Sequence, residues 1–115
     1  MLTLVSLRHR ADFVRLRRAA KRVSPFFVMR FAPTPEASLR DGQVRVGYTV
    51  TRACGNAVRR NRIKRRLRAL VREGFPQHAV PGHDYVLIAL DHAAARTATA
   101  PFDELRQAMR RMLLP

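Results

Sequence analysis

Positive charge is concentrated in one short segment of the chain, residues 55–68, which read GNAVRRNRIKRRLR. The last ten of these residues include six arginines, one lysine and no acid. Like charges three or four residues apart on a helix repel one another by roughly a few tenths of a kcal/mol per pair. Because nothing within the segment offsets this repulsion, we expect an external polyanion to supply the negative charge.

A helical wheel separates residues 55–73 into an apolar stripe and a basic side. The stripe, which should face the core, contains Ile63, Leu67, Leu70 and Val71. The opposite side carries a row about 16 Å long from the helical rise per residue, made of Asn61, Arg65, Arg68 and Arg72. The flanking positions are Lys64 on one side and Arg62 and Arg66 on the other, with Arg59 and Arg60 in the first turn. Such a row can meet several phosphates of a nucleic-acid strand.

No set of residues has the spacing of a catalytic or metal site. The eight acids are scattered between Asp12 and Glu104, whereas a metal-dependent nuclease needs clustered carboxylates. The four histidines lack metal-ligand spacing, and a single cysteine, Cys54, argues against a zinc site. We therefore expect neither a catalytic centre nor a bound metal or cofactor in this chain.

Composition favours a folded nucleic-acid-binding protein. The 115 residues carry a net charge of +15, and 47% of them are hydrophobic, which suits one domain over residues 1–115. No apolar run approaches the roughly 20 residues of a spanning helix, and residues 1–10 lack the features of a targeting segment. One cysteine excludes an intramolecular disulfide and fits a reducing cytoplasm.

Periodicity and turn residues predict the elements that position the basic segment. In chain order we expect a helix, two strands, a helix, a strand and a helix, at residues 8–20, 26–31, 43–50, 55–73, 84–90 and 101–113. Residues 33–42 should form a loop, a short extra strand fits near 21–23, and Gly74 followed by Pro76 should end the basic helix. This order predicts an α/β sandwich with helices packed on one mixed sheet.

The strands show a clear alternation of faces. On one side of residues 43–50, facing a core, we expect Val44, Val46, Tyr48 and Val50. The other side should carry Arg45, Gly47 and Thr49. In residues 26–31 one side carries Phe27, Met29 and Phe31, and the other carries Val28 and Arg30. Residues 84–90 are continuously apolar after Asp84, as expected of a strand covered on both faces.

The string RVGYTVTRACGNAVRRNRIKRRLR at residues 45–68 resembles the signature of the bacterial ribonuclease P protein component. The R-N-R-x-K-R core of that signature is matched by Arg60, Asn61, Arg62, Lys64 and Arg65. Similarity continues outside the motif, with ADF at 11–13 and DYVLIA at 84–89, and covers about residues 7–113. The resemblance implies an α+β single domain with the order α-β-β-β-α-β-α and a left-handed β-α-β crossover, against the usual handedness.

The resemblance also implies a function. The chain would be the protein subunit of a ribonucleoprotein endonuclease that removes the 5′ leader from precursor tRNA, with the catalytic centre in the RNA. Mg²⁺ would be held mainly by that RNA, and the protein would lower the Mg²⁺ requirement and broaden substrate use. Its partners would be the catalytic RNA and the precursor tRNA leader, with no DNA and no membrane, and it would act as a cytoplasmic monomer within the holoenzyme.

The resemblance assigns two sets of RNA-binding residues. The basic-helix set, for the catalytic RNA, is Arg52, Asn56, Arg59, Arg60, Asn61, Arg62, Lys64, Arg65, Arg66 and Arg68. The leader set, in a cleft between helix 8–20 and the sheet, is Phe13, Arg17, Phe27, Phe31 and Arg45. Aromatic rings combined with a basic groove are a common way to hold single-stranded RNA.

Two other functions fit the composition. A small structural protein that binds ribosomal RNA would be equally basic, and only the string at 45–68 argues against it. A DNA-binding helix domain is disfavoured because strands frame the arginine helix and no helix-turn-helix pair is present.

Overall fold

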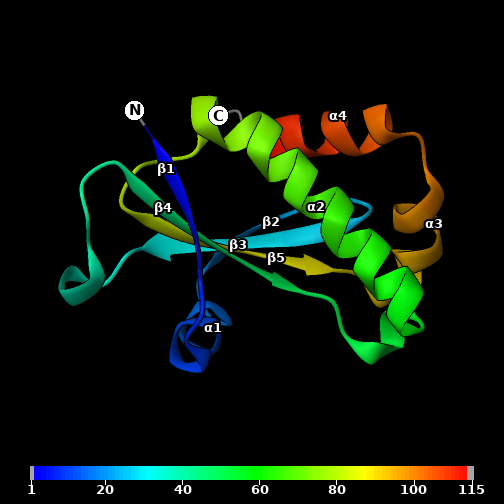
Figure 1. Ribbon diagram of the computed structural model, residues 1–115, viewed down its shortest axis with the longest axis horizontal. Coiled ribbons are helices and arrows are strands. Elements are labelled where there is room, and N and C mark those ends of the chain that lie inside the picture. The colour runs from blue at the N-terminus through cyan, green and yellow to red at the C-terminus, as the bar shows by residue number, and fades with distance from the viewer. Residues whose placement is uncertain (1, 114–115) are drawn as a thin grey trace.

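The computed structural model describes residues 2–113, in which helices cover both faces of a mixed sheet (Figure 1). Within this range the five strands are β1 (Thr3–Ser6), β2 (Ala20–Val23), β3 (Phe27–Pro33), β4 (Gln43–Thr49) and β5 (His83–Ala89). The four α-helices are α1 (Arg10–Leu16), α2 (Ala57–His78), α3 (Ala94–Thr99) and α4 (Phe102–Leu113). Three short 3₁₀ turns are η1 (Glu36–Ser38), η2 (Arg52–Cys54) and η3 (Asp91–Ala93).

The strand order across the sheet is β1-β4-β5-β3-β2. Strands β1, β4 and β5 are mutually parallel, whereas β3 pairs antiparallel with both β5 and β2. The expected α+β class is confirmed, and the expected order α-β-β-β-α-β-α is present with β1 added before α1 and α3 added before α4. Strands β4 and β5 are parallel neighbours joined through α2, and the handedness of this crossover stays a prediction.

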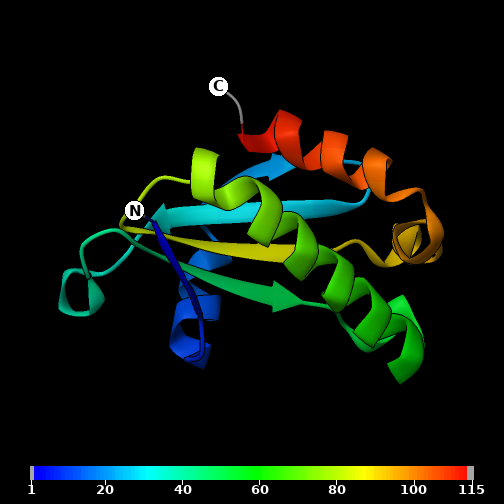
Figure 2. The same ribbon diagram turned by 45° about the horizontal axis from the view of Figure 1, so that its top comes forward.

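The two faces of the sheet carry separate apolar clusters. Figure 1 shows α2 and α4 on one face and α1 on the other, and Figure 2 shows α2 and α4 lying across the same face. The larger cluster joins α2 and α4 to alternate strand residues, which include Phe27, Met29, Val44, Val46, Tyr85 and Leu87. The smaller cluster, beneath α1, consists of Leu7, Leu16 and Val86 with partly buried neighbours. The predicted alternation of β4 and the predicted burial of β5 on both faces are therefore confirmed.

The predicted helix over residues 8–20 is wrong at both ends. The helix spans only Arg10–Leu16, and Ala20 belongs to β2. The backbone N–H of Arg17 bonds to Val14 O and that of Ala19 bonds to Leu16 O, so the last turn tightens and the chain leaves the helix. Pairing with β3, in which Ala20 lies opposite Phe31, then outweighs the local helical pattern.

The predicted end of the basic helix at Gly74 is also wrong, because α2 continues through Pro76 to His78. Gly74 is a packing position against α4, where a Cβ would lie 3.3 Å from Leu113 Cδ1 and 3.7 Å from Met109 Cγ. Pro76 is tolerated near the end of the helix, which closes with a 2.9 Å hydrogen bond from the Ala79 N–H to Phe75 O.

Two short elements were not predicted. The four residues of β1 gain their order from parallel pairing with β4, from Thr3 opposite Gln43 to Ser6 opposite Val46. The six residues of α3 are stabilised by packing on α2, and no apolar period marks them in the sequence. Both depend on partners distant in the chain, which local patterns do not report.

Candidate nucleic-acid interface

Helix α2 begins at a polar cap. The side-chain oxygen of Asn56 accepts a 2.9 Å hydrogen bond from the backbone N–H of Arg59, which satisfies one of the free donors of the first turn. Gly55 precedes the cap with φ of 129°, a conformation that favours glycine. The GNAV string therefore encodes a helix start. The side-chain oxygen of Asn56 is used within the protein, and the assignment of this residue to RNA stays a prediction.

The apolar side of α2 fixes how the basic side points. Its buried residues are Ile63, Leu67, Leu70, Val71 and Phe75, and all of them belong to the larger apolar cluster. This stripe is the predicted one extended by Phe75. Since the stripe faces the sheet, the opposite side of the helix faces solvent.

The predicted outer row, which we call the outer ridge, consists of the exposed residues Asn61, Arg65, Arg68 and Arg72. Arg68 also lies over the ring of Tyr48, with its guanidinium carbon 5.6 Å from the ring centroid. Lys64 is half-buried on the adjoining flank. Among residues 2–113, no carboxylate lies within ion-pair distance of a ridge arginine.

Arg62 and Arg66, by contrast, form hydrogen bonds with the backbone around α3. Arg62 Nε donates to the Ala98 carbonyl at 2.5 Å, while Arg66 donates to the Thr97 carbonyl at 2.9 Å and also to the Ala100 carbonyl. These are carbonyls at the end of α3, where a helix lacks internal partners and favours cations. The structure thus uses both arginines to join α2 to α3, and their assignment to RNA stays a prediction.

Replacing Arg66 by alanine is expected to lower the free energy of unfolding by about 1–3 kcal/mol, the range for hydrogen bonds that involve a charged group. The matched control is Arg65→Ala, one residue away on the outer ridge, which should change stability by no more than about 0.5 kcal/mol. Urea denaturation of both variants measures the difference. Equal stability losses would show that the two arginines are not oriented as described.

The first turn of α2 and the preceding η2 turn add further basic side chains. Arg52 and Arg59 are exposed, whereas Arg60 is half-buried with its Nε buried and lacking a hydrogen-bond partner among the described residues. Arg52 and Arg59 therefore add exposed positive charge at the start of α2, where β4 leads through η2 into the helix.

A groove lies on the opposite face of the sheet, beside α1, and we call it the α1 groove. Its lining residues are Phe13, Leu16, Arg17, Arg30, Thr49, Val86 and Ile88. Gly47 lets Phe13 lie close to β4, since a Cβ at Gly47 would be 2.6 Å from two carbons of the Phe13 ring. The groove thus combines one aromatic ring and two arginines with an apolar floor.

The leader set predicted from the sequence is divided between the two faces of the sheet. Phe13 and Arg17 line the α1 groove, but Phe27 is 0% exposed in the larger cluster and Phe31 packs against that same cluster. Because side chains alternate along a strand, Phe27 and Phe31 face α2 and α4 rather than α1. Their assignment to the cleft is wrong, and β3 contributes Arg30 to the groove instead.

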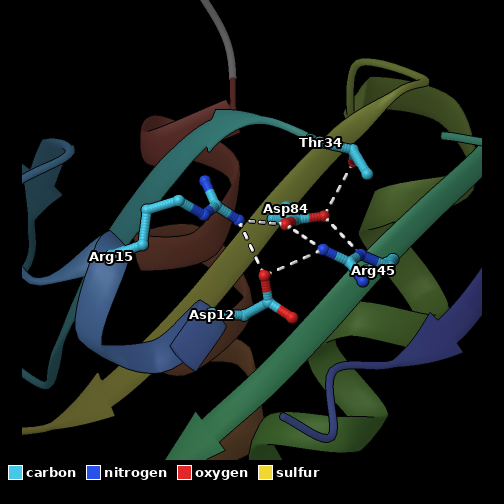
Figure 3. Close-up of polar contacts among 5 residues, drawn as sticks. All are labelled: Asp12, Arg15, Thr34, Arg45 and Asp84. Carbon is cyan, nitrogen blue, oxygen red and sulfur yellow. Dashed lines mark hydrogen bonds and ion pairs between the residues drawn. The ribbon is translucent and has the colours of Figure 1, made fainter. Parts of the chain in front are cut away.

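Arg45, the remaining member of the leader set, is 9% exposed and paired with a buried carboxylate (Figure 3). Its Nε donates to Asp84 Oδ1 at 2.8 Å and its Nη2 donates to Asp84 Oδ2 at 2.6 Å. Arg15 from α1 also donates to Asp84 Oδ2, and Thr34 donates to Asp84 Oδ1 at 2.7 Å. We call these groups, together with Asp12, the Asp84 network. It uses Nε and Nη2 of Arg45 within the protein, and the assignment of Arg45 to the leader stays a prediction.

The Asp84 carboxylate stays ionised despite its burial. Burial raises its pKa, but hydrogen bonds from Arg45 and Thr34, the charge of Arg45 and the hydrogen bond from Arg15 outweigh that effect, so the pKa lies below its ordinary value. Arg45 is affected in the complementary way, since its hydrogen bond to Asp84 raises its pKa. The Asp84–Arg45 pair is therefore ionised at neutral pH.

Sequence reasoning missed Asp84, Arg15, Arg30 and Thr49 as residues around the groove. The one signal available was the acid at the start of the continuously apolar strand, because a charge there must have a buried partner. The identity of that partner depends on the pairing of β4 with β5, in which Arg45 lies opposite Asp84.

Within residues 2–113 no three histidine, cysteine or acidic side chains are grouped so that they could hold a metal ion. The same range contains no helix with both the length and the apolar character needed to cross a membrane.

The sequence matches the family model described as Ribonuclease P over residues 1–114. The ribonuclease P protein component of Bartonella quintana is 42% identical over 111 residues, covering 95% of this chain and 80% of the relative. That of Paramagnetospirillum magneticum is 36% identical over 107 residues, covering 92% of this chain and 80% of the relative.

Solved structures agree with the sequence comparison. The RNase P protein from Thermotoga maritima superposes with a TM-score of 0.78 at 27% identity, covering 94% of each chain. The Staphylococcus aureus RNase P protein superposes with a TM-score of 0.73 at 24% identity, covering 94% of this chain and 91% of that chain, which shows a shared fold.

Proposed function

The chain belongs to the ribonuclease P protein family, and we propose that it contacts two RNAs through opposite faces of its sheet. Helix α2 binds the catalytic RNA through the outer ridge. The α1 groove binds the single-stranded 5′ leader of precursor tRNA. This membership favours the ribonuclease P role over that of a structural protein of the ribosome.

The observation that carries the proposal is the unbalanced charge of the outer ridge. Arg65, Arg68 and Arg72 are exposed and lack a carboxylate partner within the described residues, while a buried stripe holds the helix firmly against the sheet. A rigid row of arginines suits bidentate contacts with successive phosphates. Arg52 and Arg59 add further positive charge at the start of the helix.

The α1 groove supports the second contact. Phe13 offers a flat ring against which a base can stack, and Arg17 and Arg30 offer positive charge for the backbone. Thr49, one of the residues that line the groove, is also the last residue of β4, after which the chain passes through η2 into α2. An RNA strand in the groove would therefore approach the first turn of α2.

We place the catalytic centre in the RNA and propose that Mg²⁺ acts there, with the protein lowering the Mg²⁺ needed by adding positive charge between two polyanions. Four of the eight carboxylates support this division, because arginines of the protein already pair with them. Asp12 and Asp84 are paired with arginines beneath α1, and Glu73 and Asp103 are paired with Arg106 between α2 and α4.

Leader length is the variable that tests this proposal. We expect the protein to tighten binding of a precursor with a leader of several nucleotides, and trimming the leader to one nucleotide should erase most of that gain. A stacked base contributes about 1–3 kcal/mol, so the loss should be on the order of tenfold or more. Dissociation constants of the holoenzyme for both substrates, in Ca²⁺ to slow cleavage, give the measurement.

Phe13→Leu keeps an apolar side chain in the groove but removes the flat ring, so it should reduce the leader-dependent gain. Val14→Ala, at the neighbouring exposed position of α1, should leave the gain unchanged. A gain that is independent of leader length would exclude the α1 groove as the leader site. Cleavage of precursor tRNA by the purified protein without RNA would overturn the placement of the catalytic centre.

A further inference from the structure

Helix α1 is too short to hold its own position. It has seven residues, fewer than the roughly 12–15 needed for even marginal stability of an isolated helix in water. Its buried apolar contact with the sheet is limited to Leu16, in a cluster with Leu7 and Val86, together with the half-buried Phe13. A stronger interaction must fix the orientation of α1 over the strands.

The Asp84 network supplies that interaction (Figure 3). The Asp84 side chain is 0% exposed, and both of its oxygens accept hydrogen bonds from at least two donors. Two members of the network, Asp12 and Arg15, belong to α1, whereas Arg45 belongs to β4 and Asp84 to β5. Asp12 Oδ1 accepts from Arg15 at 3.3 Å and from Arg45 at 3.2 Å, so the helix is bound to two strands.

The network lies directly beside the α1 groove. Arg45 and Gly47 share one face of β4, and Gly47 is where the Phe13 ring rests. Asp84 likewise shares a face of β5 with Val86 and Ile88, which line the groove. A change in the network would therefore reach the groove through the helix that carries Phe13 and Arg17.

We propose that Asp84 is a positioning residue. Through Arg45 and Arg15 it holds α1 in the position and orientation that form the α1 groove. This inference rests on the proposed function of the groove. Asp84 itself is buried and does not contact RNA. Its effect is to present Phe13 and Arg17 correctly, because the binding of a flexible strand depends on a preorganised surface.

The Asp84→Asn variant tests this role with little change in volume. The amide nitrogen of asparagine is a donor, so it would face the donors of Arg45 or Arg15. Asp12, which is less buried than Asp84, would then be the one carboxylate left in the network for both arginines. We expect the leader-dependent gain in affinity to fall by about tenfold, the loss of one stacked base. Affinity for a precursor with a one-nucleotide leader, and for the catalytic RNA alone, should stay unchanged.

Asp41→Asn is the matched control, since Asp41 is exposed and its replacement changes net charge by the same amount. A second variant guards against misfolding of Asp84→Asn. Arg15→Gln cuts the link from α1 to Asp84 but leaves the Arg45–Asp84 pair intact, and it should also reduce the leader-dependent gain.

A structural readout separates this inference from the function of the groove. An α-proton of Gly47 points toward Cε1 and Cζ of the Phe13 ring, so the NMR shifts of Gly47 report whether α1 is docked. Both variants should move those shifts toward the values of a glycine that has no aromatic neighbour. Wild-type shifts and an unchanged leader gain in folded Arg15→Gln and Asp84→Asn proteins would overturn the positioning role. If the wild-type protein itself shows no leader-dependent gain, the proposed function fails, and the Gly47 shifts alone decide whether Asp84 holds α1.

Discussion

Replacing Arg65, Arg68 and Arg72 together by glutamine is expected to weaken binding to ribonuclease P RNA by at least about a hundredfold at low salt. Each arginine contributes roughly 1–3 kcal/mol if it forms a charge-assisted phosphate contact, and all three are exposed. The plot of log affinity against log salt should become shallower by about one unit per arginine removed. Filter binding over a salt series measures both effects.

The control for this variant removes the same charge elsewhere. Arg40, Arg110 and Arg111 are exposed and lie outside α2, so replacing them by glutamine lowers net charge equally without altering the outer ridge. Similar affinity losses in the two triple variants would show that binding follows overall charge rather than the ridge. Thermal unfolding should show little difference between either variant and the wild type, since the affected side chains do not fill the core.

Truncating the apolar side of the same helix should produce the opposite pattern. Leu67 is 0% exposed on the side of α2 that faces the sheet. Leu67→Ala is therefore expected to lower the free energy of unfolding by about 2–5 kcal/mol, the cost of lost burial plus a cavity. This is a large part of the roughly 5–15 kcal/mol of a typical domain. Urea denaturation gives the change, and RNA affinity of the folded fraction should remain near that of the wild type.

Val58→Ala is the matched control, because Val58 lies on the same helix but is 76% exposed. It should change stability by no more than about 0.5 kcal/mol. A comparable loss in both variants would mean that α2 does not present Leu67 to the sheet, and the outward direction of the arginines would then be in doubt as well.

The sequence by itself determined the elements whose pattern is local and strong. The alternation of Val44, Val46 and Tyr48 placed β4 and its core face, and the continuous apolar run after Asp84 placed β5. The stripe of Ile63, Leu67 and Leu70 set the direction of the outer ridge. These features follow from the spacing of apolar residues, about every second residue in a strand and every third or fourth in a helix, which can be seen within a single segment. The motif at residues 45–68 was enough to indicate the family.

The tertiary structure alone decided where α2 ends and which of its arginines form hydrogen bonds within the protein. Gly74 has the residue type of a helix end, but it packs against Leu113 and Met109, so α2 continues. Arg62 and Arg66 resemble the other arginines of α2, yet the end of α3 accepts their hydrogen bonds. In each case the deciding partner is more than thirty residues away in the chain.

The candidate groove shows the same division. Phe13 and Arg17 could be assigned to a leader cleft because the family resemblance implies one beside the first helix. The alternation of side chains along β3, however, places Phe27 and Phe31 on the opposite face. Arg45 could be chosen as a cation, yet the parallel register of β4 on β5 places it opposite Asp84. Charge and residue type are properties of the sequence, whereas whether a charge is free to bind RNA depends on which buried group the fold brings against it.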